Sequence, residues 1–302
     1  MISVRGLTKK YGDILALNNI NMYVSKGEIY GFIGHNGAGK STAMNILAGL
    51  SHPDDGECIV NGKNLRGLKH AGDLGIGYLP EEPKFYPWMT AAESLEYLGG
   101  SIRKRRIVEI MEWVGLSGAA NRRVGGYSRG MKQRLGIAAA MIHDPELLIL
   151  DEPSSALDPE GRSDVLRLIA EMKQLGKTIL FSSHILNDVE RICDTIGMIR
   201  NGEMILEKSL GDIQRNSIKP VFEISLPVPL PQSVLKELRK MDGVTGIEFD
   251  DGSINVEVEG SENPSVGLMH FLSAHDIAVE SFQLMRRDLE DIFLKEARAH
   301  DL

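Results

Sequence analysis

The residues from Gly34 to Thr42 have the types and the spacing of a loop that binds nucleoside triphosphates. They fit the pattern G-x-x-x-x-G-K-[ST], in which glycines let the backbone bend so that consecutive N–H groups face phosphate oxygens. The residues that this pattern assigns to nucleotide binding are Gly34, His35, Asn36, Gly37, Ala38, Gly39, Lys40, Ser41 and Thr42. We expect Lys40 to reach the β- and γ-phosphates, and the Ser41 hydroxyl to bind Mg²⁺.

The residues on either side of this loop predict the elements that hold it. An apolar run from Ile29 to Ile33 predicts a strand, and apolar residues at Met44, Ile46, Leu47 and Leu50 have the spacing of a helix. A glycine loop between a strand and a helix is the context in which this motif binds phosphate. The helix start near Lys40 adds the positive end of its dipole.

A second pair of chemically capable residues follows another apolar run. The segment Leu147–Leu150 predicts a buried strand that leads directly into Asp151 and Glu152. Beside a phosphate loop, Asp151 can hold Mg²⁺, and Glu152 can polarise the water that attacks the γ-phosphate. The alternative is that both acids are solvated residues at a strand end before a turn at Pro153.

The order of elements predicts an α/β fold. Residues 1–30 alternate in the manner of half-exposed strands, and the later strands alternate with helices, so we expect a mostly parallel sheet covered by helices. Residues 90–116 read as helical, with a short connection between helices from Gly99 to Ile107, and Ser128 and Asp158 are expected to cap two further helices.

The last part of the chain predicts a separate small domain. Pro220 and the polar residues near 216 mark a boundary, after which the pattern reads strand–helix–strand–strand–helix–strand with a final helix over 289–297. This order indicates a ferredoxin-like α+β module over 219–302.

Bulk properties exclude several classes of protein. The 302-residue chain carries a net charge of −8, which argues against a nucleic-acid partner because such proteins present a basic surface. No apolar run approaches the about 18 residues of a membrane-spanning helix. The first residues, MISVRGLTKKYG, lack the layout of a signal peptide, and the two cysteines have no metal-binding spacing.

Residues 127–153, YSRGMKQRLGIAAAMIHDPELLILDEP, resemble the block from signature to Walker B of ATP-binding cassette (ABC) ATPases. The likeness covers roughly residues 1–216 in the order that the family shows. It implies a P-loop cassette with an antiparallel β subdomain and a helical subdomain at about 82–142. The signature here is Tyr-Ser-Arg-Gly-Met rather than Leu-Ser-Gly-Gly-Gln, so the contacts of its third and fifth positions are open.

This resemblance also assigns roles to individual residues. Tyr11 would stack on adenine, while Ser128 and Gly130 of the signature loop would contact the γ-phosphate of a nucleotide held mainly by a second copy. His184 would be the switch histidine that assists Glu152 and Lys40 in catalysis. Glu81, or Glu82 one position later, stands where the family usually has glutamine, and we expect Glu81 to approach the metal with Ser41 and Asp151. Ordinary structural roles for Tyr11 and His184 remain the alternatives.

Three features together look like the ATPase subunits of type-2 ABC exporters: the acidic residue near Glu81, the YSRGM signature, and the sequence Leu-Glu-Asp-Ile-Phe at 289–293. The resemblance implies an ATPase that uses ATP and Mg²⁺, works as a homodimer or heterodimer, and drives export through a separate permease. It also implies a cytoplasmic protein, peripheral on the cytoplasmic face of the membrane. A cassette ATPase acting on ribosomes or DNA, and a weakly hydrolysing regulatory subunit, are the alternatives.

Overall fold

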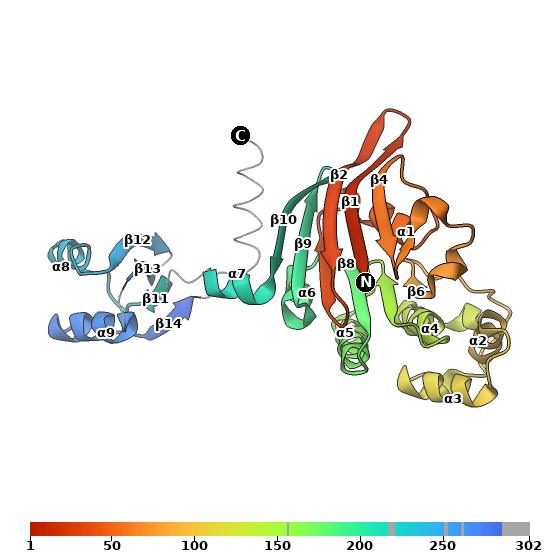
Figure 1. The fold of residues 1–302 in the computed structure, drawn as a ribbon. Helices are drawn as coiled ribbons and strands as arrows, with labels where there is room; N and C mark the ends of the chain where they lie inside the picture. Colours follow the sequence, from red (N-terminus) through yellow and green to blue (C-terminus); the bar gives the residue numbers. More distant parts are fainter. Residues whose placement is uncertain (156, 217–220, 251–252, 261–262, 286–302) are drawn as a thin grey trace. The chain divides into compact units, whose positions relative to one another are not determined.

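The largest sheet of the computed structural model has six strands in the order β10-β9-β3-β8-β7-β6. Figure 1 labels β10, β9, β8 and β6 of this sheet. Its strands are β3 (Ile29–Ile33), β6 (Ile76–Leu79), β7 (Leu147–Leu150), β8 (Thr178–Ser183), β9 (Thr195–Arg200) and β10 (Glu203–Ser209). Every neighbouring pair from β9 to β6 is parallel, and β10 is antiparallel to β9. Strands β3, β7 and β8 are buried along their whole length, as expected of strands that are covered on both faces.

A second, antiparallel sheet has the order β2-β1-β4-β5. Its strands are β1 (Ile2–Tyr11), β2 (Ile14–Val24), β4 (Asp55–Val60) and β5 (Lys63–Asn64). Alternate residues of β1 and β2, such as Leu7 and Ile20, enter one core together with Met44 and Leu47 of helix α1 (Lys40–Leu47). The antiparallel part of the predicted cassette therefore packs against the helix that follows the phosphate loop.

Three helices form a group of their own: α2 (Ala91–Gly99), α3 (Lys104–Trp113) and α4 (Arg129–Met141). They lie within the predicted helical subdomain, and the break between α2 and α3 falls inside the short connection expected between Gly99 and Ile107. Gly100 has a φ of 57° and ends α2, because only glycine adopts this conformation without strain. The remaining helices beside the large sheet are α5 (Pro159–Gln174) and α6 (Leu186–Ile192), with α7 (Leu210–Asn216) after β10.

A third sheet, of order β12-β13-β11-β14, belongs to a separate compact unit. Its elements are β11 (Val221–Ser225), α8 (Gln232–Leu238), β12 (Val244–Asp250), β13 (Ser253–Val258), α9 (Pro264–Ala274) and β14 (Ser281–Met285). Strand β11 is antiparallel to both β13 and β14, and Leu238 and Leu268 of the two helices enter its core. This order of elements and strands is the ferredoxin-like one.

The structure describes residues 1–155, 157–216, 221–250, 253–260 and 263–285. The helix predicted over 289–297, the LEDIF sequence at 289–293 and Ala156 of the loop after Glu152 lie outside them. The first compact unit runs from Met1 to Leu210 and the second begins at Gly211. The residues of α7 after Leu210 therefore group with the second unit, ahead of the boundary predicted near 216. Among the described helices, none has both the length and the hydropathy needed to cross a bilayer.

Candidate active site

The predicted site residues follow four neighbouring parallel strands. Strands β3, β8, β7 and β6 lie side by side in this order. The phosphate loop follows β3, His184 follows β8, Asp151 and Glu152 follow β7, and Glu81 lies just beyond β6. Because the carboxyl ends of parallel strands meet at one edge of a sheet, residues far apart in the sequence come together there.

The phosphate loop owes its shape to glycines in the left-handed region. Gly37 has a φ of 82° and Gly39 a φ of 111°, and α1 begins directly after Gly39. A Cβ at Gly39 would lie 2.6 Å from the carbonyl oxygen of Ala16, so the loop and β2 approach too closely for any other residue. No side chain caps the start of α1, which leaves its first N–H groups to an anion.

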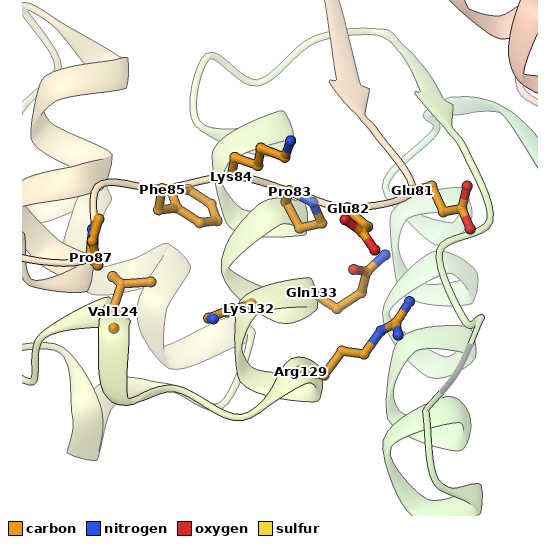
Figure 2. A pocket seen from close by; sticks show the side chains of 11 residues that line it. Glu81, Glu82, Pro83, Lys84, Phe85, Pro87, Val124, Arg129, Lys132 and Gln133 are labelled. Atoms are coloured by element: carbon orange, nitrogen blue, oxygen red, sulfur yellow. The ribbon is translucent and has the colours of Figure 1, made fainter.

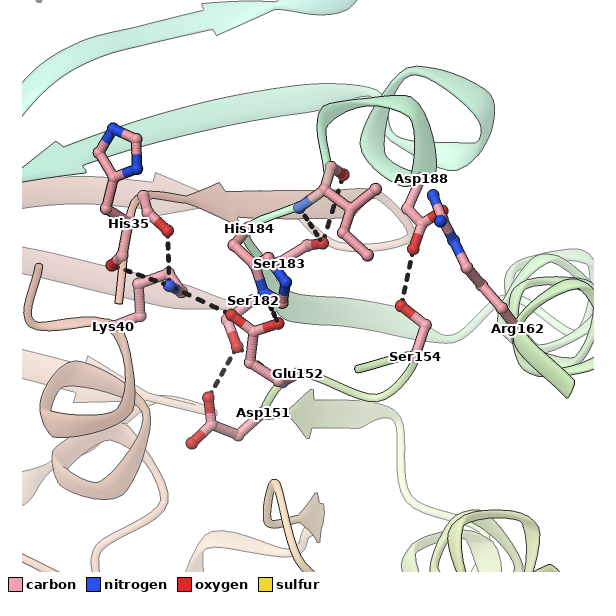
Figure 3. A network of polar contacts seen from close by, with 12 residues as sticks. His35, Lys40, Asp151, Glu152, Ser154, Arg162, Ser182, Ser183, His184 and Asp188 are labelled. Atoms are coloured by element: carbon pink, nitrogen blue, oxygen red, sulfur yellow. Dashed lines mark hydrogen bonds and ion pairs between the residues drawn. The ribbon is translucent and has the colours of Figure 1, made fainter. Parts of the chain in front are cut away.

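Lys40 is almost completely buried, with 5% of the residue exposed. Its ammonium donates to the carbonyl oxygens of Gly34 at 2.6 Å and His35 at 3.2 Å (Figure 3). The same Nζ lies 3.1 Å from Oε1 of Glu152. The loop backbone therefore holds the Lys40 charge at the place where the predicted γ-phosphate and the predicted catalytic base meet.

Three residues hold Glu152: Lys40 at its Oε1, Ser182 and His184. The N–H of Glu152 donates to the Ser182 hydroxyl at 2.8 Å, and its Oε2 lies 2.8 Å from Nδ1 of His184. Its φ of 46° is rare for a residue with a side chain, and a strained backbone of this kind persists only where its surroundings fix it. The structure thus brings Glu152, Lys40 and His184 together, as the sequence predicted.

Asp151 is a buried carboxylate that accepts a hydrogen bond from the Ser182 hydroxyl at 2.7 Å. Burial raises the pKa of Asp151, and this outweighs the hydrogen bonds from Ser182 and Ser41 that lower it. A carboxylate that water solvates poorly gains from a bound cation, so the pair Asp151 and Ser41 fits Mg²⁺ chemically.

A cavity of about 610 Å³ opens at this edge of the sheet. It is lined by the phosphate loop, two glutamates, His184, the start of β2 and the turn between β9 and β10. The lining residues are Ile14, Leu15, Ala16, Asn36, Gly37, Gly39, Lys40, Ser41, Thr42, Glu81, Glu152, His184, Asn201 and Gly202. Glu81 lines this cavity, whereas Glu82 lines the separate groove beside α4. The sequence had left the register between these two glutamates open; Glu81 is the one that lines the nucleotide cavity, and its approach to the metal stays a prediction.

Several residues predicted to bind nucleotide lie outside this lining: Gly34, His35 and Ala38 of the phosphate loop, Tyr11, Ser128 and Gly130. Asp151, predicted to hold the metal, is also outside it. Tyr11, at 51% exposed, pairs across the hairpin with Ile14, which is 70% exposed and lines the cavity. Ser128 caps α4 and accepts from the N–H of Met131 at 3.2 Å, with Gly130 in the first turn of that helix. The adenine contact of Tyr11 and the phosphate contacts of the signature loop therefore stay predictions.

The sequence missed several residues that shape the site. Ser182 joins Asp151 to the N–H of Glu152, and Ser154 donates to the buried carboxylate of Asp188 at 2.7 Å. Ile14 and Leu15 offer exposed apolar surface beside the phosphate loop, and an apolar pair directly after the turn at Gly12 is the signal that could have found them.

Comparisons with known proteins point in the same direction. A family model described as ABC transporter matches residues 17–155. The uncharacterized ABC transporter ATP-binding protein YxlF of Bacillus subtilis (strain 168) is 37% identical over 99% of this chain and 100% of its own length. The bacitracin transport ATP-binding protein BcrA of Enterococcus faecalis is 35% identical over 98% of this chain and 96% of its own. The linearmycin resistance ATP-binding protein LnrL of Bacillus subtilis (strain 168) is 31% identical over 97% of each chain.

Among solved structures, the ATP-binding cassette MJ0796, in a dimeric post-hydrolysis state with ADP and Pi, superposes with a TM-score of 0.64. Its identity is 28%, and the match covers 70% of this chain and 99% of that one. The match to relatives over nearly the whole length, together with the geometry of Lys40, Asp151 and Glu152, settles the family. The chain belongs to the ABC transporter ATP-binding proteins and is an ATP-hydrolysing subunit.

Proposed function

We propose that this chain drives export through a separate membrane permease, with ATP binding closing a dimer and hydrolysis reopening it. The observation that carries the proposal is the contact of the buried Glu152 with both Lys40 and His184 at the nucleotide cavity. The signature residues Ser128 and Gly130 do not line that cavity in the described part of the chain. A second copy that presents its own α4 start would complete the site.

The reaction is the attack of water on the γ-phosphorus, with ADP as the leaving group. Lys40 turns from Glu152 to the phosphate oxygens, which releases Oε1 of Glu152 to accept a proton from the attacking water. His184 keeps the Glu152 carboxylate in place through Nδ1. Mg²⁺, when bound, neutralises phosphate charge, and Ser41, Asp151 and Glu81 would hold it.

We propose that the permease binds in a groove between the segment after β6 and the start of α4. The groove encloses about 530 Å³ and is lined by Glu81, Glu82, Pro83, Lys84, Phe85, Pro87, Val124, Gly125, Arg129, Lys132 and Gln133 (Figure 2). Glu81 lines both this groove and the nucleotide cavity. A permease segment seated here would touch the same short stretch of backbone that approaches the nucleotide.

Three exposed aromatic rings lie beside the residues of this groove. Tyr86 is 48% exposed, and Trp88 and Tyr97 are each 65% exposed. The ring centroid of Tyr86 lies 5.0 Å from that of Trp88 and 6.0 Å from that of Tyr97. Clustered aromatic side chains on a surface favour protein contact, because they bury much apolar area at a low cost in side-chain entropy.

The names of two relatives, BcrA for bacitracin transport and LnrL for linearmycin resistance, support export as the direction of transport. The cargo would contact the permease rather than this chain. We place the protein on the cytoplasmic face of the membrane, held there through the groove residues and the aromatic rings of Tyr86, Trp88 and Tyr97.

The test is an ATP-loaded capture with Glu152→Gln from detergent-solubilised membranes of the native cell. A multi-span membrane protein should be recovered, and the double variant Trp88→Ala/Tyr97→Ala should lose it while still binding ATP. Arg105→Ala, which removes an exposed ion pair with Glu109 on α3, is the matched surface control. Recovery of ribosomal or nucleic-acid components instead would overturn the export proposal.

A further inference from the structure

Asp188 is a charged residue with 1% of its surface exposed, in the first turn of α6. That helix begins directly after the loop that carries His184. A buried carboxylate is costly unless its charge is paired and its oxygens are hydrogen-bonded. The hydrogen-bond partners of Asp188 show which segments of the chain this buried carboxylate connects.

Both oxygens of Asp188 are used (Figure 3). Oδ2 accepts from the Ser154 hydroxyl at 2.7 Å, and Oδ1 accepts from Nε of Arg162 at 2.6 Å, with a second guanidinium nitrogen at 2.5 Å. Ser154 is itself 2% exposed and lies two positions after Glu152. One carboxylate therefore joins the segment after Glu152, the start of α5 and the helix that follows His184.

The two segments that Asp188 joins are those whose side chains meet in the active site. Oε2 of Glu152 contacts Nδ1 of His184 at 2.8 Å, and the Glu152 backbone is in the left-handed region. The turn is closed by the N–H of Ser155, which donates to the carbonyl oxygen of Glu152 at 3.1 Å. The hydrogen bond from the Ser154 hydroxyl to Asp188 fixes the position of this turn. The same hydrogen bond fixes the start of α6, which follows the His184 loop.

We propose that Asp188 is a positioning residue for ATP hydrolysis, which aligns Glu152 with His184 by tying Ser154 and Arg162 to the start of α6. Asp188 itself is not among the residues that line the nucleotide cavity. The inference rests on the proposed role of Glu152 as the base, and it adds a residue pair, Ser154 and Asp188, that no motif of the family pattern above contains.

The test compares Ser154→Ala and Asp188→Asn in the full chain with the matched control Lys173→Gln. Lys173 makes an ion pair of 2.5 Å with Asp194 from the other end of α5, away from the Glu152 and His184 loops. We expect kcat to fall about tenfold or more in Ser154→Ala, because small displacements of a catalytic group cost large factors in rate. The KM for ATP should stay within about twofold, since Lys40 and the phosphate loop are untouched.

A second measurement separates alignment from a general loss of stability. In a His184→Ala background there is no Glu152–His184 contact left to align, so Ser154→Ala should lower kcat by much less than in the wild-type chain. The ¹⁵N shifts of the His184 ring at fixed pH should change in Ser154→Ala and remain unchanged in Lys173→Gln. A merely structural role would produce equal rate losses in both backgrounds.

The outcomes distinguish this inference from the proposed function. If the wild-type chain hydrolyses no ATP, or if Glu152→Gln hydrolyses at the wild-type rate, the role of Glu152 fails and this inference fails with it. If Glu152 behaves as proposed but Ser154→Ala matches Lys173→Gln in kcat, the positioning role of Asp188 alone is wrong. Asp188→Asn repeats the comparison from the other side of the same hydrogen bond.

Discussion

Nζ of Lys40 lies 3.1 Å from Oε1 of Glu152, and the two side chains are only 5% and 7% exposed. Each residue thus neutralises the other inside the protein. Phosphate oxygens compete for the same ammonium, so nucleotide binding has to replace Glu152 as the partner of Lys40. The replaced carboxylate keeps His184 as its neighbour and becomes available to a water molecule.

Glu152→Gln is expected to bind ATP at least as tightly as the wild-type chain and to lose hydrolysis by a factor of about 10² to 10⁴. The amide cannot accept a proton from water, and it no longer competes with phosphate for Lys40. Calorimetric binding and phosphate release measure the two effects. Glu160→Gln, an exposed acid in the first turn of α5, is the control and should leave both unchanged. Turnover of Glu152→Gln at the wild-type rate would exclude Glu152 as the base.

Lys40→Ala is expected to abolish ATP binding and also to lower the free energy of unfolding of the nucleotide-free protein. Removing one partner of a buried ion pair typically costs about 3–5 kcal/mol, because the other charge stays buried. The double variant Lys40→Ala/Glu152→Gln should recover much of that loss, which denaturant unfolding would measure. If the double variant is no more stable than Lys40→Ala, the ion pair with Glu152 does not contribute to stability.

The parts of the site that sequence predicted are those with local causes. The loop up to Lys40 and the acids Asp151 and Glu152 each follow one strand, so a short pattern specifies both position and chemistry. The parallel order of the strands then places them together without further information. For the same reason, the location of Glu81 at the carboxyl end of a strand was predictable. Which of Glu81 and Glu82 lines the cavity depended on a register of one residue that the sequence did not specify.

Contacts between distant segments had no such signal. Ser154 and Asp188 are 34 positions apart, and either residue alone reads as an ordinary polar position near a helix start. Ser182 looks like a strand end until its hydroxyl is seen between Asp151 and the N–H of Glu152. The break between α2 and α3, by contrast, was predictable, because Gly99 and Gly100 interrupt the helical pattern there.

Gly39→Ala is expected to damage nucleotide binding more than Gly37→Ala does. Both glycines have positive φ, so alanine strains the backbone at either position by about 1–2 kcal/mol. A Cβ at Gly39 would also lie 2.6 Å from the carbonyl oxygen of Ala16, whereas a Cβ at Gly37 meets nothing within 4 Å. ATP affinity and melting temperature, measured on both variants, should therefore separate strain from steric overlap. Equal losses would show that the approach of β2 does not constrain the loop.

Asp151→Asn is expected to stabilise the nucleotide-free protein at neutral pH while removing Mg²⁺-dependent hydrolysis. Burial raises the pKa of Asp151 in the folded protein above the usual 3.8, so the folded chain binds this proton more tightly than the unfolded chain. The free energy of unfolding consequently falls as pH rises from 3.8 through the raised pKa, and above it the full cost of the buried charge is present.

The stabilisation by Asp151→Asn should therefore be largest above the raised pKa and should disappear below pH 3.8, where the carboxyl is protonated in both states. Thermal unfolding across this range measures it, with Asp73→Asn, an exposed acid, as the control. Added Mg²⁺ and ATP should reverse the order, because the wild-type carboxylate then gains a cation that the amide binds weakly. A variant that is less stable than wild type at neutral pH would show that the hydrogen bond from Ser182 to the carboxylate outweighs the cost of burying its charge.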